Sequence, residues 1–201
     1  MWIKGVSMKL SRMTGTVVDQ VLFFYRNGVR SNSINAIEPV VRNNIHYRGM
    51  GVADLYQVGN IYSQLNQGSS LSWERKKFYH LLGNKLMLLA WGSNGNRDVV
   101  VGLNMYYLNA RDVKESTIHE GFIGVLPEAR GQGIATSLRR VAKEHFAMAG
   151  FKGISTRISL CNKGSLNSAL QIGFKPVEKY YDMNSDAERY YLVCNLEGAV
   201  N

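Results

Sequence analysis

The chain has 201 residues, of which 45% are hydrophobic and 19% are charged. Such values are ordinary for globular proteins and exclude wholesale disorder, and the length fits one domain with an N-terminal elaboration. The formal net charge of +9 favours anionic partners, such as a nucleotide, an acyl carrier protein or nucleic acid, and it disfavours a polycationic substrate.

The two cysteines, Cys161 and Cys194, lie far apart and show no C-x-x-C or Cys/His spacing. A structural disulfide and a zinc site are therefore not expected, and we predict no metal. Residues 1–24 lack an apolar core long enough for a signal peptide or a membrane-spanning helix. We expect a cytoplasmic protein without a membrane anchor, as a monomer or a homodimer.

The first 70 residues carry the weakest pattern, and we predict a mainly helical N-terminal region, 1–70, ahead of a core, 71–201. Ser33–Ile45 has roughly helical spacing, and Ala53–Leu65 fits a second helix or a covering loop. The glycine-rich stretch between them, YRGMGVA, indicates a break.

The pattern becomes clear from Leu71 onward. A helix is predicted to begin at Ser72 as its N-cap and to end at Gly83. LMLLAWG and RDVVVGLNMYYLN are strand-like, and Asn94-Gly95 between them is typical of a hairpin turn. ESTIHEGFIGVL is the next predicted strand, and Pro127 ends it because proline cannot donate to a sheet.

A helix is predicted over residues 133–149, with Ile134, Leu138 and Val141 on its apolar face and Arg139 pointing elsewhere. The alternating GISTRISL then predicts a half-buried strand, and a short helix follows over residues 166–172. FKPVEKYYDM and RYYLVCNLE complete the chain as an antiparallel pair. This order predicts an α+β fold with a strand–loop–helix–strand unit at its centre.

The stretch GVLPEARGQGIATSLRR, residues 124–140, leads from a strand through a bare loop into a helix. The first backbone N–H groups of a helix have no intrahelical partner, and the helix dipole favours negative charge there. Gly131 and Gly133 would allow a phosphate to approach the backbone closely. The residues alone leave two interpretations open: an anion site, or a turn that packs a helix closely on a sheet.

Two blocks of this sequence resemble the GCN5-related N-acetyltransferase (GNAT) superfamily. Arg130–Ala135 matches its R/Q-x-x-G-x-G/A motif and follows Val125-Leu126-Pro127, as the V-x-P of the family does. NKGSLNSALQIGF, residues 162–174, resembles the second family block in the correct order and spacing. The resemblance covers roughly residues 86–196 and leaves the first 70 unassigned.

The resemblance implies a twisted mixed sheet, flanked by helices, in which two central parallel strands splay apart. Acetyl-CoA, or another acyl-CoA, would enter that cleft as the co-substrate, and residues 1–70 would belong to the acceptor side. The implied coenzyme-binding residues are Ile123, Gly124, Val125, Arg130, Gly131, Gln132, Gly133, Ile134, Ala135, Asn162 and Ser165.

Acyl transfer to an amine requires a neutral amine, and deprotonating a lysine-like amine at pH 7 costs about 4 kcal/mol. A positioned base must therefore take the proton. His119 and Glu120 lie where many family members carry this base, and adjacent strand residues point to opposite faces, so one of the two is expected to serve. Ala169 occupies the position of the usual acidic tyrosine, and Tyr180 or Tyr181 is the candidate substitute.

Three functions are compatible with these observations. The first is an acetyl-CoA-dependent N-acetyltransferase acting on the primary amine of a small molecule, with a nucleotide-linked amino sugar as one option. The second is an N-acyltransferase that takes a long acyl chain from an acyl carrier protein or a long acyl-CoA. The third is a non-catalytic module that binds acyl-CoA or associates with nucleic acid, and the missing tyrosine motivates it.

Overall fold

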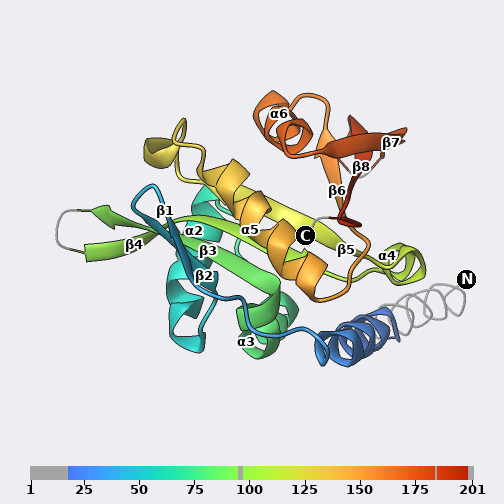
Figure 1. Ribbon diagram of the computed structural model, residues 1–201, viewed down its shortest axis with the longest axis horizontal. Coiled ribbons are helices and arrows are strands. Elements are labelled where there is room, and N and C mark those ends of the chain that lie inside the picture. The colour runs from blue at the N-terminus through green and yellow to red at the C-terminus, as the bar shows by residue number, and fades with distance from the viewer. Residues whose placement is uncertain (1–17, 95–96, 184, 199–201) are drawn as a thin grey trace, which may run out of the picture.

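The computed structural model describes residues 18–94, 97–183 and 185–198, and Figure 1 shows the path of the chain. Residues 18–31 are helical. The further elements are β1 Val40–Arg42, β2 Ile45–Gly49, η1 Val52–Asp54, α2 Leu55–Leu65, α3 Trp73–Leu86, β3 Met87–Asn94, β4 Arg97–Tyr107, α4 Ala110–Glu115, β5 Thr117–Val125, η2 Pro127–Ala129, α5 Ile134–Met148, β6 Gly153–Ser159, α6 Lys163–Gln171, β7 Phe174–Asp182 and β8 Ala187–Asn195.

These strands form one mixed sheet in the order β1-β2-β3-β4-β5-β6-β8-β7. Of its pairs, β5–β6 is parallel, and the other neighbouring strands of the described chain are antiparallel. The β5–β6 connection runs through α5, which crosses one face of the sheet, while α2 and α3 lie behind the sheet in Figure 1. This confirms the expected α+β architecture with splayed central strands.

The core lies on both faces of the sheet. Between α5 and the sheet, Ile134, Leu138 and Val141 pack against strand residues such as Leu88 and Val101. The larger cluster joins Phe78 and Tyr79 of α3 to the central strands and reaches the base of α6. No helix within the described ranges has the length and apolarity needed to cross a bilayer.

The expected helix over Ser33–Ile45 is wrong. Residues 40–49 form the β1–β2 hairpin, and its turn residues Asn43 and Asn44 have φ of 50° and 60°. Asparagine tolerates this left-handed conformation, so Asn-Asn between two apolar runs is a hairpin signal that outweighs the loose helical spacing. The second expectation holds, because residues 55–65 form α2.

The helix α3 begins as predicted, because the Ser72 side chain accepts a hydrogen bond from Arg75 N–H. It does not end at Gly83, which lies inside the helix. A Cβ at Gly83 would come within 2.9 Å of Met50 Cε, so this glycine serves close packing rather than helix termination. The predicted turn between β3 and β4 falls on residues 95 and 96, which lie outside the described residues.

The helix α4 was not anticipated. Asn109 caps it by accepting from the N–H groups of Arg111 and Asp112, while Asp112 accepts from Asn109 N–H in return. This reciprocal capping box can be read from the sequence as Asn-x-x-Asp. The boundary predicted at residue 70 stays a prediction, although β2 pairs with β3 across it in a continuous sheet.

Candidate functional site

A cleft opens where β5 and β6 separate. The two strands pair from Thr117↔Gly153 to Glu120↔Thr156, and beyond that point β5 follows β4 alone up to Val125. The cleft encloses about 580 Å³. Ten of the eleven predicted coenzyme-binding residues line it, and Gln132 is exposed beside it. The lining also includes residues that were not predicted to bind the coenzyme: Leu65, Phe122, Ala129, Thr136, Arg139, Gly164 and Ser168.

The glycine loop has the backbone shape of an anion cradle. Gly131 and Gly133 have φ of 79° and 73°, in the left-handed region that favours glycine. A Cβ at either position would point into open space, so their need for glycine is conformational. Gly133 caps α5 without a side-chain hydrogen bond, and the first N–H groups of this 15-residue helix therefore lie open to the cleft.

The opposite wall of the cleft is the start of α6. Asn162 Oδ1 accepts from Ser165 N–H at 3.2 Å and so caps this helix. The hydroxyl groups of Thr136 and Ser168 lie 3.3 Å apart and join α5 to α6 beside the cleft. At the base, a Cβ on Gly124 would meet Leu65 Cδ1 at 2.6 Å, so α2 approaches β5 as closely as glycine permits.

Glu120 faces α5 and is held in a buried ion pair. Its carboxylate and the guanidinium of Arg139 are each 1% exposed and 2.7 Å apart, and Asn104 Nδ2 donates to the carboxylate at 2.9 Å. Burial alone would raise the pKa of Glu120, but the charge of Arg139 and these hydrogen bonds hold that pKa below its usual value. Arg139 does not point to solvent as expected; it also donates to Ser165 of α6.

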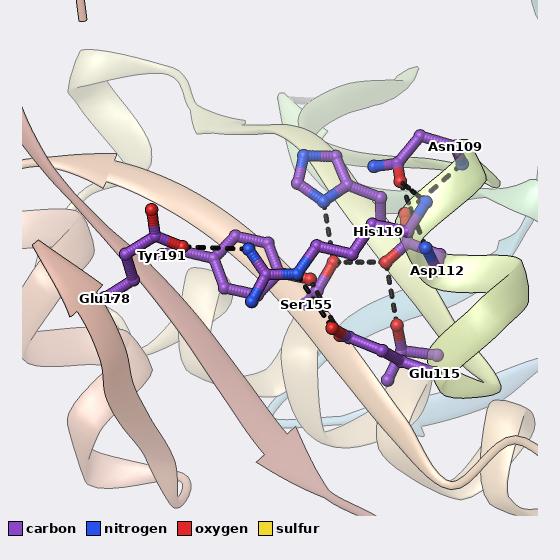
Figure 2. Close-up of polar contacts among 9 residues, drawn as sticks. Asn109, Asp112, Glu115, His119, Ser155, Glu178 and Tyr191 are labelled. Atoms are coloured by element: carbon purple, nitrogen blue, oxygen red, sulfur yellow. Dashed lines mark hydrogen bonds and ion pairs between the residues drawn. The ribbon is translucent and has the colours of Figure 1, made fainter. Parts of the chain in front are cut away.

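His119 faces the other side of the sheet and ends a chain of buried hydrogen bonds (Figure 2). Its Nδ1 lies 2.7 Å from Ser155 Oγ, and that hydroxyl donates to Asp112 Oδ1 at 2.6 Å. Because the Ser155 proton is directed to Asp112, Ser155 Oγ accepts from Nδ1–H, which leaves the lone pair of the ring on Nε2. Burial lowers the pKa of His119, Asp112 opposes this shift and the charge of Arg157 adds to it.

A second cavity, here called the aromatic pocket, lies on the His119 side of β5 and encloses about 200 Å³. It shares Phe122 with the cleft, at the level where the strands part. The His119 ring contacts the ring of Tyr107 in its wall, with centroids 5.1 Å apart. The pocket is lined by Phe23, Arg75, Phe78, Tyr79, Met105, Tyr107, Gly121 and Phe122.

The candidate tyrosines lie away from both cavities. Tyr181 is on β7 at the edge of the sheet, and its hydroxyl donates to Asp186 in the β7–β8 turn. Tyr181 is 54% exposed and is not part of the core. Tyr180 is on the same edge strand. Ala169, which replaces the usual tyrosine, is fully buried in the core.

A family model described as Acetyltransferase (GNAT) family matches residues 52–174, more than half of the chain. The chain belongs to the GNAT acetyltransferase family. By this membership it is an acetyl-CoA-dependent N-acetyltransferase. A comparison with curated proteins found no match.

Solved structures share the GNAT fold at low identity. A putative acetyltransferase from Salmonella typhimurium, yncA with acetyl-CoA, is 18% identical with a TM-score of 0.64, covering 79% of this chain and 98% of that one. A chain of the NatC complex bound to Gag peptide and CoA is 15% identical with a TM-score of 0.63, and the match covers 76% of this chain and 98% of that one. An N-acetyltransferase from Staphylococcus aureus Mu50 is 18% identical with a TM-score of 0.63, and the match covers 77% of this chain and 99% of that one.

The cleft of this GNAT enzyme fits acetyl-CoA. The open amides after Gly133 can bind the pyrophosphate, and Arg130, whose Nε donates to Val125 O at 3.2 Å, places positive charge beside them. The β5 segment that has lost β6 as a neighbour can pair with the amides of the pantetheine arm. Asn162 and Ser165 face that segment across the cleft.

Proposed function

We propose that the protein transfers acetyl from acetyl-CoA to the primary amine of a small molecule, with His119 as the general base. The observation that carries this proposal is the position of the aromatic pocket, which we assign to the amine and call the acceptor pocket from here on. It adjoins the cleft at Phe122, on the same face of β5 as His119, whereas Glu120 faces α5. An amine in this pocket lies beside the donor cleft, on the face of β5 that carries His119.

The proton path follows from strand geometry. Gly121 lines the acceptor pocket, and His119 is two residues earlier on β5. Two residues of a strand span ~7 Å, a distance that one water molecule can bridge between an amine beside Gly121 and His119 Nε2. The chain His119–Ser155–Asp112 orients the ring and stabilises the imidazolium formed when the proton arrives.

Acetyl-CoA supplies the activated acetyl group as a thioester. His119 takes one proton from the ammonium form of the acceptor and returns it to solvent. The neutral nitrogen then bonds to the acetyl carbon, the carbon–sulfur bond breaks and the sulfur leaves as a thiolate. The nitrogen loses its second proton, which passes through water to the thiolate, so the products are the amide and the free thiol. A thiol pKa of about 8.5 makes the thiolate a good leaving group, so the reaction proceeds with Ala169 in place of an acidic tyrosine.

The size and lining of the pocket favour a small amine acceptor and an acetyl donor over a nucleotide-linked amino sugar or a long acyl chain. Its aromatic lining offers few partners for the hydroxyl groups of a nucleotide-linked amino sugar, and an unpaired buried hydroxyl is costly. A long acyl chain would fill the same space of about 200 Å³ that the acceptor requires. Acetyl transfer leaves this space to the amine.

Calorimetry with acetyl-CoA, octanoyl-CoA and palmitoyl-CoA tests donor binding. In Gly133→Glu, a carboxylate faces the pyrophosphate site and strains the left-handed backbone, so acetyl-CoA affinity should fall at least ~100-fold. Met148→Glu adds the same charge at the far end of α5, where Met148 is 67% exposed, and should bind as wild type does. Preference for the long chains, or no binding of acetyl-CoA, would contradict the proposed donor.

Turnover is then measured with a panel of small primary amines and with a peptide of free N-terminus. We expect acetylation of small amines, with loss of activity in His119→Gln. If only the peptide is acetylated, the small-molecule proposal is overturned while the acetyltransferase activity stands. If His119→Gln keeps full turnover, the assignment of the base is overturned.

A further inference from the structure

The acceptor pocket combines an aromatic wall with unneutralised positive charge. Phe23 packs against Phe78 and Tyr107, with ring centroids 5.0 and 5.8 Å apart. Phe122 packs against Tyr62 of α2 at 4.8 Å. These rings come from five separate parts of the fold and form a preorganised apolar wall. Such a wall favours an apolar or aromatic group on the acceptor.

The cation in this wall is Arg75 of α3. Arg75 is exposed, its side chain lines the pocket, and its Nη1 donates to Tyr62 Oη at 3.2 Å. Among the described residues, no carboxylate forms an ion pair with Arg75. A guanidinium presents several N–H donors in a planar fork, and one bond to a tyrosine leaves donors available to a ligand.

A second arginine lies on the same side of the sheet. Arg157 follows Ser155 by two residues on β6, so both side chains project from the face that carries His119. It lies just past the last β5–β6 pair, Glu120↔Thr156, where the strands separate. Its charge acts on both His119 and Tyr107. Within the described chain it too has no carboxylate in an ion pair.

The available volume sets the size of the acceptor. A cavity of roughly 150 Å³ holds benzene, and this pocket encloses about 200 Å³. It therefore holds one ring, or a branched alkyl group of similar size, with a few further atoms. The two arginines disfavour a polyamine, because each added ammonium group would meet positive charge.

We propose that the acceptor is a free amino acid or a closely similar amine: an apolar or aromatic group for the pocket, a carboxylate for Arg75 and Arg157, and the amino group that is acetylated. This inference rests on the proposed function and names the substrate class of the same site. A peptide N-terminus presents an amide where the free amino acid presents its carboxylate, so the unpaired guanidinium groups favour the small molecule.

The test compares phenylalanine with phenylalaninamide, which differ only in the carboxylate. We expect kcat/KM for phenylalanine to exceed that for the amide by at least ~10-fold in the wild type, because a charge-assisted pair is lost with the amide. Arg75→Met should lower the ratio several-fold without abolishing it, because Arg157 remains, and Arg75→Lys should restore part of the loss. Arg140→Met removes the same charge from an exposed position of α5 and should leave the ratio unchanged.

Each outcome decides between specific alternatives. Equal or better use of phenylalaninamide, or of a peptide beginning with phenylalanine, overturns the amino-acid proposal even though acetylation occurs. A ratio that Arg75→Met does not change overturns the role of Arg75. Failure of the proposed function can be distinguished from failure of the amino-acid proposal. In that case acetyl-CoA does not bind in calorimetry, or it binds but no small amine of the panel is acetylated.

Discussion

His119 and Glu120 are adjacent on β5, both are buried and both can titrate, yet their surroundings are opposite. Glu120 is 3% exposed and its carboxylate accepts hydrogen bonds from Arg139 and Asn104. His119 is also 3% exposed, but one ring nitrogen is fixed by Ser155 and the other carries a lone pair. The comparison teaches that the hydrogen-bond partners of a buried group, rather than its burial, determine whether it can accept a proton.

The two sites also differ in what they stabilise. The Glu120–Arg139 pair joins β5 to α5 and, through Ser165, to the start of α6. Breaking one half of such a pair leaves an uncompensated charge in the interior. The His119 chain joins β5, β6 and α4 by hydrogen bonds that end on the carboxylate of Asp112. The first region therefore bears mainly on stability, whereas the second contains the residue to which we assign proton transfer.

The largest expected effect is on turnover in His119→Gln. Glutamine keeps a hydrogen bond to Ser155 but cannot take the amine proton, so kcat should fall ~10²–10⁴-fold, the usual contribution of a general base. Acetyl-CoA affinity and the melting temperature should change little, because the cleft lies beyond Gly121. Steady-state kinetics with calorimetry and thermal unfolding check this. An equal fall in coenzyme affinity would show that the residue acts on the fold instead.

Glu120→Gln should lower the free energy of unfolding by about 3–5 kcal/mol, because it leaves Arg139 charged in the interior. Chemical denaturation of the purified variant measures this loss. The double variant Glu120→Leu/Arg139→Met removes both charges and should recover most of it. If the single variant is as stable as the wild type and inactive, Glu120 is a catalytic group and the comparison fails.

The pH dependence of stability separates the two residues further. The pKa of Glu120 is depressed, so its contribution is complete above the unfolded value of about 4.3 and is lost as pH falls through the native pKa. Glu120→Gln should lack this acid-linked loss. Denaturation midpoints measured between pH 3 and pH 7 check it. Parallel curves for the two proteins would contradict the ion-pair account.

Ser155→Ala should lower kcat about 10-fold with little change in KM. The alanine removes the acceptor that fixes Nδ1–H and the link to Asp112, so the ring loses its preferred tautomer and orientation. Thr156→Ser, a conservative change at the next position of β6, is the matched control and should retain wild-type kcat. A purely structural role for Ser155 would appear as a lower melting temperature with normal turnover per folded enzyme.

The smallest expected effect is a shift of the acid limb of the pH–rate profile. Burial lowers the pKa of His119, so log kcat/KM should decline only below pH ~6.5, as the imidazole becomes protonated. Asp112→Asn removes a charge that raises this pKa, and the limb should move to still lower pH. A shift to higher pH would contradict the assignment of the limb to His119.

The glycine loop and the order of strands from β3 onward could be predicted from the sequence because local signals agree there. Gly131, Gly133 and Pro127 each act within a few residues of their position, and the alternation of β6 is unbroken. The first 70 residues were harder, because the β1–β2 hairpin is short and its Asn-Asn turn competes with a chance helical spacing.

The burial of Arg139 could not be predicted because it depends on a partner 19 positions away in the chain. Helical periodicity assigns a charged residue to the surface by default, and only the three-dimensional approach of Glu120 reverses this. The same holds for Arg75 of α3 and Tyr107 of β4, which are far apart in the chain and line one pocket. The position of Asp112 at the start of a helix could have been predicted, since Asn109 three residues earlier is a capping signal.

Gly121 is one residue more than β5 needs to keep its alternation. Glu120 pairs with Tyr106 and Phe122 with Met105, so deleting Gly121 would leave every later side chain of the strand on its present face. The surplus peptide unit is outside the β4 ladder, at the level where β6 has already departed. A Gly121 deletion should therefore fold but lose turnover. Because the peptide unit of Gly121 is not paired with β4, its polar groups are available to a molecule bound at the junction of the two cavities.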